Sequence, residues 1–129
     1  LVSERIESFI LGKRLEDAIK RAEAYSRAGA DAILIHSKDT DPKKIFSFAK
    51  KFSKSKFFKP LVSVPSSYSK TYEKNLIKNN FKIVIYANQL IRASYPAMVS
   101  TAKSILYNKR SFEAQKKISS INEIINLIK

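Results

Sequence analysis

The chain has 129 residues, a length that suits one domain, and 44% of them are hydrophobic, which is ample for a buried core. It contains no cysteine, so a disulfide framework and a thiolate metal site are both excluded. No apolar run approaches the ~18 residues of a membrane-spanning helix, and no signal-peptide pattern is present. We therefore expect a cytoplasmic protein with no membrane partner.

The formal net charge of +14 is typical of nucleic-acid-binding proteins. The distribution of that charge favours another interpretation, because only six of the 25 basic residues are Arg and the lysines are spread along helix-like segments. The densest group lies at residues 43–59, where Lys and Phe interleave. A groove that tracks a nucleic-acid strand has this composition, but so does an amphipathic helix whose Phe side packs inward. We favour the helix and expect no nucleic-acid partner.

The first half of the chain alternates apolar runs with segments of helical period. An apolar run at residues 1–6 precedes a predicted helix over residues 15–28, whose apolar side chains recur at helical spacing. Gly29 is expected to end this helix in a left-handed conformation. The next run, residues 32–35, is continuously apolar, which is typical of a strand buried on both faces.

The same alternation continues to the end of the chain. Asp41 is expected to be the N-cap of a helix that has Pro42 in its first turn and reaches Phe52. The later predicted elements are a strand at 61–64, a short helix near 70–79, a strand at 83–86, a long helix at 94–107 and a final helix from 121. Pro96 should lie in the first turn of the long helix, because Pro within a helix breaks its hydrogen bonds. Ser120 and Glu123 have the spacing of a capping box.

Four strand–helix units predict an α/β protein with a parallel sheet. Both an open doubly wound sheet and part of a (β/α)₈ TIM barrel fit this pattern. The only glycines are Gly12 and Gly29, so no glycine-rich loop supports dinucleotide or P-loop binding. A barrel needs about 250 residues, and this chain begins at Leu1, inside an apolar run and without an initiator Met. We therefore expect the C-terminal half of a larger barrel, strands five to eight, as a single domain over residues 1–129.

A polar side chain stands at the end of each apolar run, and in a barrel this is the side of the active site. These candidate residues are Arg5, His36, Ser66 and Asn88. Arg5 suits an anion clamp, because a guanidinium holds phosphate or carboxylate through paired hydrogen bonds. It equally suits a salt bridge with a flanking Glu. Ser66 and Asn88 could contact a ligand or cap the helices that follow.

His36 is the only histidine of the chain, so no metal cluster built on several histidines is possible within it. Its place directly after an apolar strand favours the active face. Asp39 and Asp41 follow closely, but Asp41 is explained as a helix cap. A divalent-metal site needs carboxylates that converge from several strands, and these four strands do not supply them. No Ser–His–Asp set is recognisable.

Several blocks of the sequence, in this order and spacing, resemble the phosphoenolpyruvate mutase family of the isocitrate lyase superfamily. These blocks are Arg5–Ile10, Ala22–Tyr25, Ala28–Lys38, Val64–Ser66, Ile85–Asn88 and Arg92–Ala93. The resemblance covers nearly the whole chain and implies the C-terminal half of the barrel. It also implies a Mg²⁺-dependent isomerase that interconverts phosphoenolpyruvate and phosphonopyruvate in phosphonate biosynthesis.

The resemblance further implies roles for individual residues. Arg5 and His36 correspond to the Arg and His that hold the phosphoryl group, and Ser66 and Asn88 are the other expected substrate-binding residues. The catalytic Asp and the acids that bind Mg²⁺ are expected on the N-terminal half, so this chain alone should be inactive. Glu4 stands where relatives carry a small residue, and it could pair with Arg5.

The helical segment at about residues 94–129 is expected to pack on a neighbouring subunit in a homodimer or homotetramer, because this is how the final helix packs in relatives. Two alternatives remain open for function. One is phosphonopyruvate hydrolase, which shares this half and cleaves the same bond with water; Lys38, after His36 and Ser37, favours the mutase. The other is a non-catalytic basic half-barrel that serves as a binding or assembly module.

Overall fold

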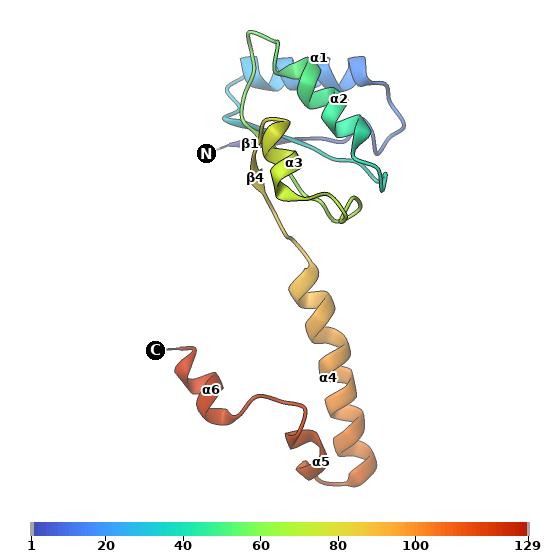
Figure 1. Ribbon diagram of the computed structural model, residues 1–129, viewed down its shortest axis with the longest axis vertical. Coiled ribbons are helices and arrows are strands. Elements are labelled where there is room, and N and C mark those ends of the chain that lie inside the picture. Colours follow the sequence, from blue (N-terminus) through green and yellow to red (C-terminus); the bar gives the residue numbers. More distant parts are fainter. Residues whose placement is uncertain (1, 129) are drawn as a thin grey trace. The chain divides into compact units, whose positions relative to one another are not determined.

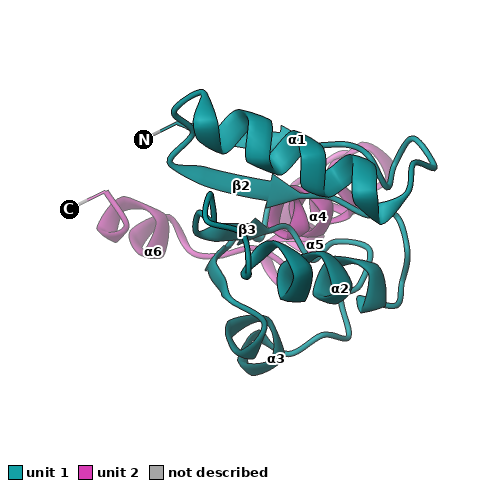
Figure 2. Ribbon diagram, turned by 90° about the horizontal axis from the view of Figure 1, so that it is seen from above, with its two compact units in different colours: residues 1–87 teal, residues 88–129 magenta. Residues whose placement is uncertain are grey.

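A computed structural model describes residues 2–128, and the chain divides into two compact units, residues 1–87 and 88–129 (Figures 1 and 2). The first unit alternates strands and helices. Its elements are β1 (Ser3–Ile6), α1 (Leu15–Arg27), β2 (Ala32–Ile35), α2 (Lys43–Phe52), β3 (Leu61–Ser63), α3 (Glu73–Lys78) and β4 (Phe81–Val84). Leu1, where the first predicted apolar run starts, lies outside the described residues.

The four strands form one parallel sheet in the order β1-β2-β3-β4. A doubly wound sheet reverses its strand order at a switch point, whereas strands that neighbour each other in chain order are the arrangement of a barrel. The observed order therefore agrees with the predicted half of a (β/α)₈ barrel.

One face of the sheet packs against the helices. Ile6 pairs with Ile35, and Leu61 pairs with both Ile33 and Phe81, so these strand residues share a face. They form a single buried cluster with helix residues Ala18 and Ala22 of α1, Ile45, Phe48, Ala49 and Phe52 of α2, and Leu76 of α3. The Phe-rich side of α2 thus packs inward, as the sequence predicted.

The opposite face of the sheet carries a second row of side chains, which we call the inner row. It consists of Arg5, Leu34, Val62 and Ile83, which pair in succession across the four strands. Ile83 is 38% exposed and Ile85, two residues on, is 42% exposed. A β-bulge between β3 and β4 leaves Lys82 without a paired residue, so Phe81 faces the helices while Ile83 belongs to the inner row.

Helix α1 ends as the sequence predicted. Gly29 has φ +107°, its N–H donates to the Ser26 carbonyl, and the Ala30 N–H donates to the Tyr25 carbonyl. These two bonds make a Schellman motif, which satisfies carbonyls that the helix end leaves free. The chain then turns directly into β2.

Several predicted boundaries in the first unit were displaced. The fourth strand begins at Phe81 rather than at residue 83, because burial of Phe81 against the helices extends the pairing beyond the bulge. Helix α2 begins at Lys43, so Pro42 rather than Asp41 is the N-cap residue. The Asp41 side chain still accepts the Lys43 N–H at 3.0 Å. Helix α3 starts at Glu73 rather than near residue 70, because the preceding segment is a loop held by the buried Tyr68.

The second unit is helical and contains α4 (Gln89–Asn108), α5 (Phe112–Gln115) and α6 (Ile121–Asn126). The prediction that Pro96 opens the long helix was wrong, because α4 begins at Gln89 and Pro96 lies inside it. The residues before Pro96 include good helix formers such as Leu90 and Ala93. They extend the helix even though Pro96 cannot donate to the Arg92 carbonyl.

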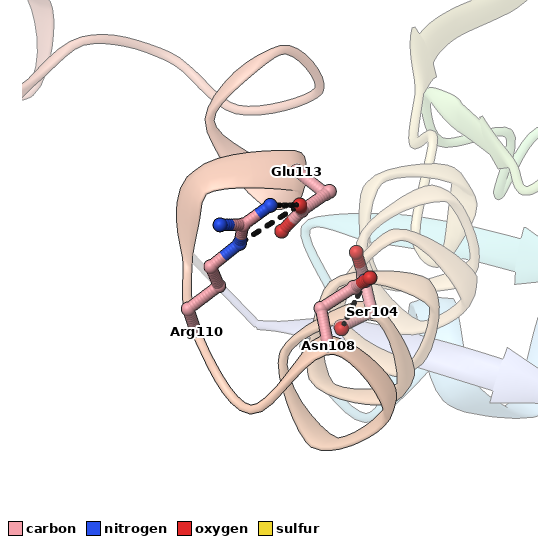
Figure 3. Close-up of polar contacts among 4 residues, drawn as sticks. All are labelled: Ser104, Asn108, Arg110 and Glu113. Carbon is pink, nitrogen blue, oxygen red and sulfur yellow. Dashed lines mark hydrogen bonds and ion pairs between the residues drawn. The ribbon is translucent and has the colours of Figure 1, made fainter.

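The end of α4 is marked by Lys109, which has a left-handed φ of +57°. Around this turn the Asn108 side chain donates to the Ser104 carbonyl at 2.8 Å, and Arg110 pairs with Glu113 at the start of α5 (Figure 3). The short α5 was not predicted. The capping box of α6 was, and Ser120 and Glu123 form both of its hydrogen bonds. None of the helices among residues 2–128 is long and apolar enough to span a membrane.

Candidate functional site

The two basic candidates lie on adjacent strands and on the same face of the sheet. Arg5 is within β1, one residue before its end, and His36 directly follows β2. Arg5 pairs with Leu34, two residues before His36. Because side chains alternate along a strand, Arg5 and His36 both belong to the face that the helices do not cover. The His36 N–H donates to the Ile6 carbonyl at 3.3 Å, so the sheet continues to this point.

Arg5 makes an ion pair with Glu7, through its Nε and the Oε1 of that carboxylate. The Arg5 side chain remains 57% exposed. Glu4, the other flanking carboxylate that could pair with Arg5, precedes it by one position, and strand alternation therefore directs it to the other face. The flanking carboxylate that matters is Glu7.

The His36 ring is partly buried, and its Nδ1 atom is buried without a hydrogen-bond partner among residues 2–128. Burial lowers the pKa of His36 below its ordinary value of 6.5, and the positive charge of Arg5 lowers it further, while Glu7 acts in the opposite direction. The imidazole is therefore neutral near pH 7. A neutral ring offers one N–H donor and one acceptor nitrogen.

The loop after β2 is shaped by Ser37, whose side chain is buried. Its hydroxyl accepts the Asp39 N–H at 3.1 Å. The two acidic residues of this loop are held in ion pairs: Asp39 with Lys44 at 2.8 Å and Asp41 with Lys43 at 2.9 Å. No group of three or more His, Asp or Glu side chains able to hold a metal ion exists among residues 2–128.

The loop after β3 carries Ser66 and is anchored by Tyr68. The Tyr68 ring is fully buried, and its hydroxyl lies 3.0 Å from that of Ser63, which is also buried. Burial raises the pKa of Tyr68, so the phenol stays protonated. Ser66 is half-buried, and its N–H donates to the Val64 carbonyl at 2.9 Å.

A polar cavity of about 300 Å³ lies between the loops that follow β2 and β3. It is lined by Thr40, Asp41, Ser67, Ser69 and Lys70. Ser67, rather than the predicted Ser66, lines this cavity.

Asn88 belongs to the second unit, where it directly precedes α4. Its side chain makes no capping hydrogen bond, and within residues 2–128 its buried Oδ1 has no partner. The Asn88 N–H donates to the Gln89 side chain at 3.1 Å. The capping alternative that the sequence left open for Asn88 therefore does not hold.

Comparison with known proteins agrees with this architecture. Residues 1–106 match the family described as phosphoenolpyruvate phosphomutase. The chain belongs to this family. It is 38% identical over 126 residues to phosphoenolpyruvate phosphomutase from Tetrahymena pyriformis, covering 98% of the chain and 41% of that protein. It is 36% identical over 128 residues to phosphonopyruvate hydrolase from Variovorax sp. (strain Pal2), covering 98% of the chain and 43% of that protein.

Solved structures support the same fold for this member of the phosphomutase family. The crystal structure of phosphoenolpyruvate phosphomutase from Streptomyces platensis subsp. rosaceus aligns with a TM-score of 0.88 at 34% identity, over 98% of this chain and 43% of that one. Phosphonopyruvate hydrolase in complex with oxalate and Mg²⁺ aligns with a TM-score of 0.87 at 36% identity, over 98% and 44%. The chain thus spans less than half the length of these relatives.

Magnesium is present in that hydrolase complex, but the described part of this family member has no carboxylate set for it. The acidic side chains nearest the candidate site are already paired with lysine or arginine. Residues 2–128 therefore do not by themselves make the oxygen-rich site that Mg²⁺ requires.

Proposed function

We propose that this chain forms the phosphoryl-binding half of a phosphoenolpyruvate mutase barrel. The observation that carries the proposal is the shared face of Arg5 and His36 on adjacent strands, with the buried Nδ1 of His36 left without a partner. A buried polar atom without a partner is costly, and a bound substrate would supply the missing hydrogen bond. The family and the resemblance of its Arg5 and His36 blocks support the same conclusion.

In this reaction the phosphoryl group leaves the enol oxygen of phosphoenolpyruvate and becomes bonded to C3 of the same molecule, which gives phosphonopyruvate. One O–P bond breaks, one C–P bond forms, and no co-reactant is consumed. The transferring group spreads negative charge over its oxygens, so positioning and cationic stabilisation supply most of the catalysis. Arg5 supplies the fixed positive charge, and the neutral His36 supplies a hydrogen bond.

The remaining parts of the site follow from the same proposal. Ser66 and Asn88 complete the contacts to the substrate. From the family resemblance, we place the catalytic Asp and the carboxylates that hold Mg²⁺ outside residues 1–129. The chain by itself is then inactive.

Phosphonopyruvate hydrolase activity is the second candidate, because the chain is nearly as similar to that enzyme as to the mutase. Incubating phosphonopyruvate and Mg²⁺ with the protein as its gene encodes it, followed by ³¹P NMR, separates the two. A mutase converts the phosphonate signal into that of phosphoenolpyruvate, whereas a hydrolase yields inorganic phosphate and pyruvate. If the phosphonopyruvate signal persists although the protein is folded, the proposal is refuted and the non-catalytic basic module is the remaining alternative.

We also propose that the C-terminal helical segment, residues 94–129, packs on a second copy of the chain in a homodimer or homotetramer. Support comes from α6 and the residues just after it, whose large apolar side chains are exposed: Ile121, Ile124, Ile125, Leu127 and Ile128. Such a patch is typical of an interface. Analytical ultracentrifugation should show that Ile125→Lys lowers the oligomeric state, while the neighbouring Asn126→Lys does not. Equal behaviour of the two variants would contradict this interface.

A further inference from the structure

Glu7 forms an ion pair with Arg5, one of the two proposed phosphoryl-binding residues. It lies two positions after Arg5, so strand alternation directs both side chains to the face that carries His36. The recorded contact is between the Arg5 Nε and the Glu7 Oε1. Among residues 2–128, Glu7 is the only acidic side chain that forms an ion pair with the Arg5 guanidinium.

We propose that Glu7 is a positioning residue whose ion pair with Arg5 holds the guanidinium on the face that carries His36, where its remaining N–H donors can meet the phosphoryl oxygens. This inference rests on the proposed function and adds a role for a residue that does not itself touch the substrate. A guanidinium has five N–H donors in a fixed planar fork. One carboxylate cannot occupy all five donors, so the paired guanidinium keeps donors for an anion.

Glu7 favours anion binding by restricting the rotamers of Arg5, and not by attracting the anion. Arg5 is 57% exposed, and a long exposed side chain that must be immobilised on binding lowers affinity by its lost rotamer freedom. A carboxylate that already holds the side chain removes part of this cost. The negative charge of Glu7 itself opposes an anionic ligand, so the two effects have opposite signs.

The pKa of His36 is a second observation that places Glu7 near the same site. The pKa of His36 responds to both neighbours: after burial, the charge of Arg5 lowers it and the charge of Glu7 raises it. Glu7 therefore lies within electrostatic range of both groups that would meet the phosphoryl oxygens. Glu4, with the same charge but on the opposite face of the strand, is a matched control.

The experiment compares Glu7→Gln with Glu7→Ala in the protein as its gene encodes it. Both variants remove the charge, but only Gln keeps a polar side chain of the same length that can contact the Arg5 guanidinium. Binding of inorganic phosphate is measured by NMR on the ring proton of His36, which is assigned by its absence from a His36→Asn variant. The same spectra, recorded against pH, give the pKa of His36.

We expect Glu7→Gln to bind phosphate roughly fivefold more tightly than Glu7→Ala, the range set by ordering one long side chain. Both variants should lower the pKa of His36, while Glu4→Gln should change neither quantity. Equal affinities of the Gln and Ala variants would overturn the positioning role while leaving the anion site intact. The positioning role would also be overturned if Glu4→Gln changed the phosphate affinity and the pKa of His36 as much as Glu7→Gln does. Absence of phosphate binding in the unmodified protein would overturn the proposed function and this inference together.

Discussion

Replacing Tyr68 with Phe should lower the free energy of unfolding by about 2 kcal/mol, although Phe fills nearly the same space. The Tyr68 and Ser63 side chains are both fully buried, and their hydroxyls lie 3.0 Å apart. Removing one partner of a buried hydrogen bond leaves the other unsatisfied, which costs ~1–3 kcal/mol. Because Tyr68 anchors the loop that carries Ser66, its loss should also loosen this part of the candidate site.

The size of the Tyr68–Ser63 interaction can be isolated with a double-mutant cycle. Ser63→Ala should also lower the free energy of unfolding, by ~1–3 kcal/mol, because it leaves the buried Tyr68 hydroxyl without its hydrogen-bond partner. The double variant should then cost about 1 kcal/mol less than the sum of the two single variants, because neither hydroxyl is left without its partner. Urea unfolding followed by circular dichroism measures all four proteins.

Tyr72→Phe is the matched control, because Tyr72 is in the same loop region but 69% exposed. Its substitution should change stability by no more than about 0.5 kcal/mol. If the Tyr68 and Ser63 effects are strictly additive, the two hydroxyls do not interact in the folded protein. The loop would then be held by ring packing alone.

Three further predictions concern His36 and the end of α1. In the active protein, His36→Asn should reduce turnover about 100-fold, whereas the exposed Lys50→Ala should leave it nearly unchanged; equal kinetic effects would remove His36 from the site. The folded pKa of His36 is below 6.5, so as pH falls through 6.5 the unfolded chain takes up the proton first and stability decreases. Urea unfolding at pH 8 and pH 5 should show a smaller decrease for His36→Asn, and an identical decrease would contradict the lowered pKa. Gly29→Ala should cost about 1 kcal/mol through backbone strain alone, because φ is +107° and an added Cβ meets no atom within 4 Å. An unchanged thermal midpoint would show that Ala tolerates this conformation.

Features that depend on local sequence were predictable. Gly29 ends α1, Ser120 and Glu123 cap α6, and residues 32–35 form a buried strand, because each depends on neighbouring residues. The family and half-barrel architecture were also recognisable, since blocks such as Ala28–Lys38 retain their order and spacing.

Features that depend on distant contacts were not predictable from local pattern. Phe81 at the start of β4 packs against helices earlier in the chain, and the loop before α3 contains Tyr68, whose hydroxyl contacts that of Ser63. The contact of Glu7 with Arg5 could have been found, because a spacing of two residues along a strand places side chains on one face. A salt bridge with a flanking Glu was expected, but the choice between Glu4 and Glu7 was left open.

The bulge at Lys82 has a consequence for where this chain can lose a residue. Deleting one residue from a strand normally moves every later side chain to the opposite face of the sheet. Such deletions are therefore expected to be strongly destabilising. Here β4 already contains one surplus position, so excising Lys82 would restore one-to-one pairing of Phe81 and Ile83 with Leu61 and Val62. A deletion scan across β4 should therefore find tolerance at this codon and intolerance on either side of it.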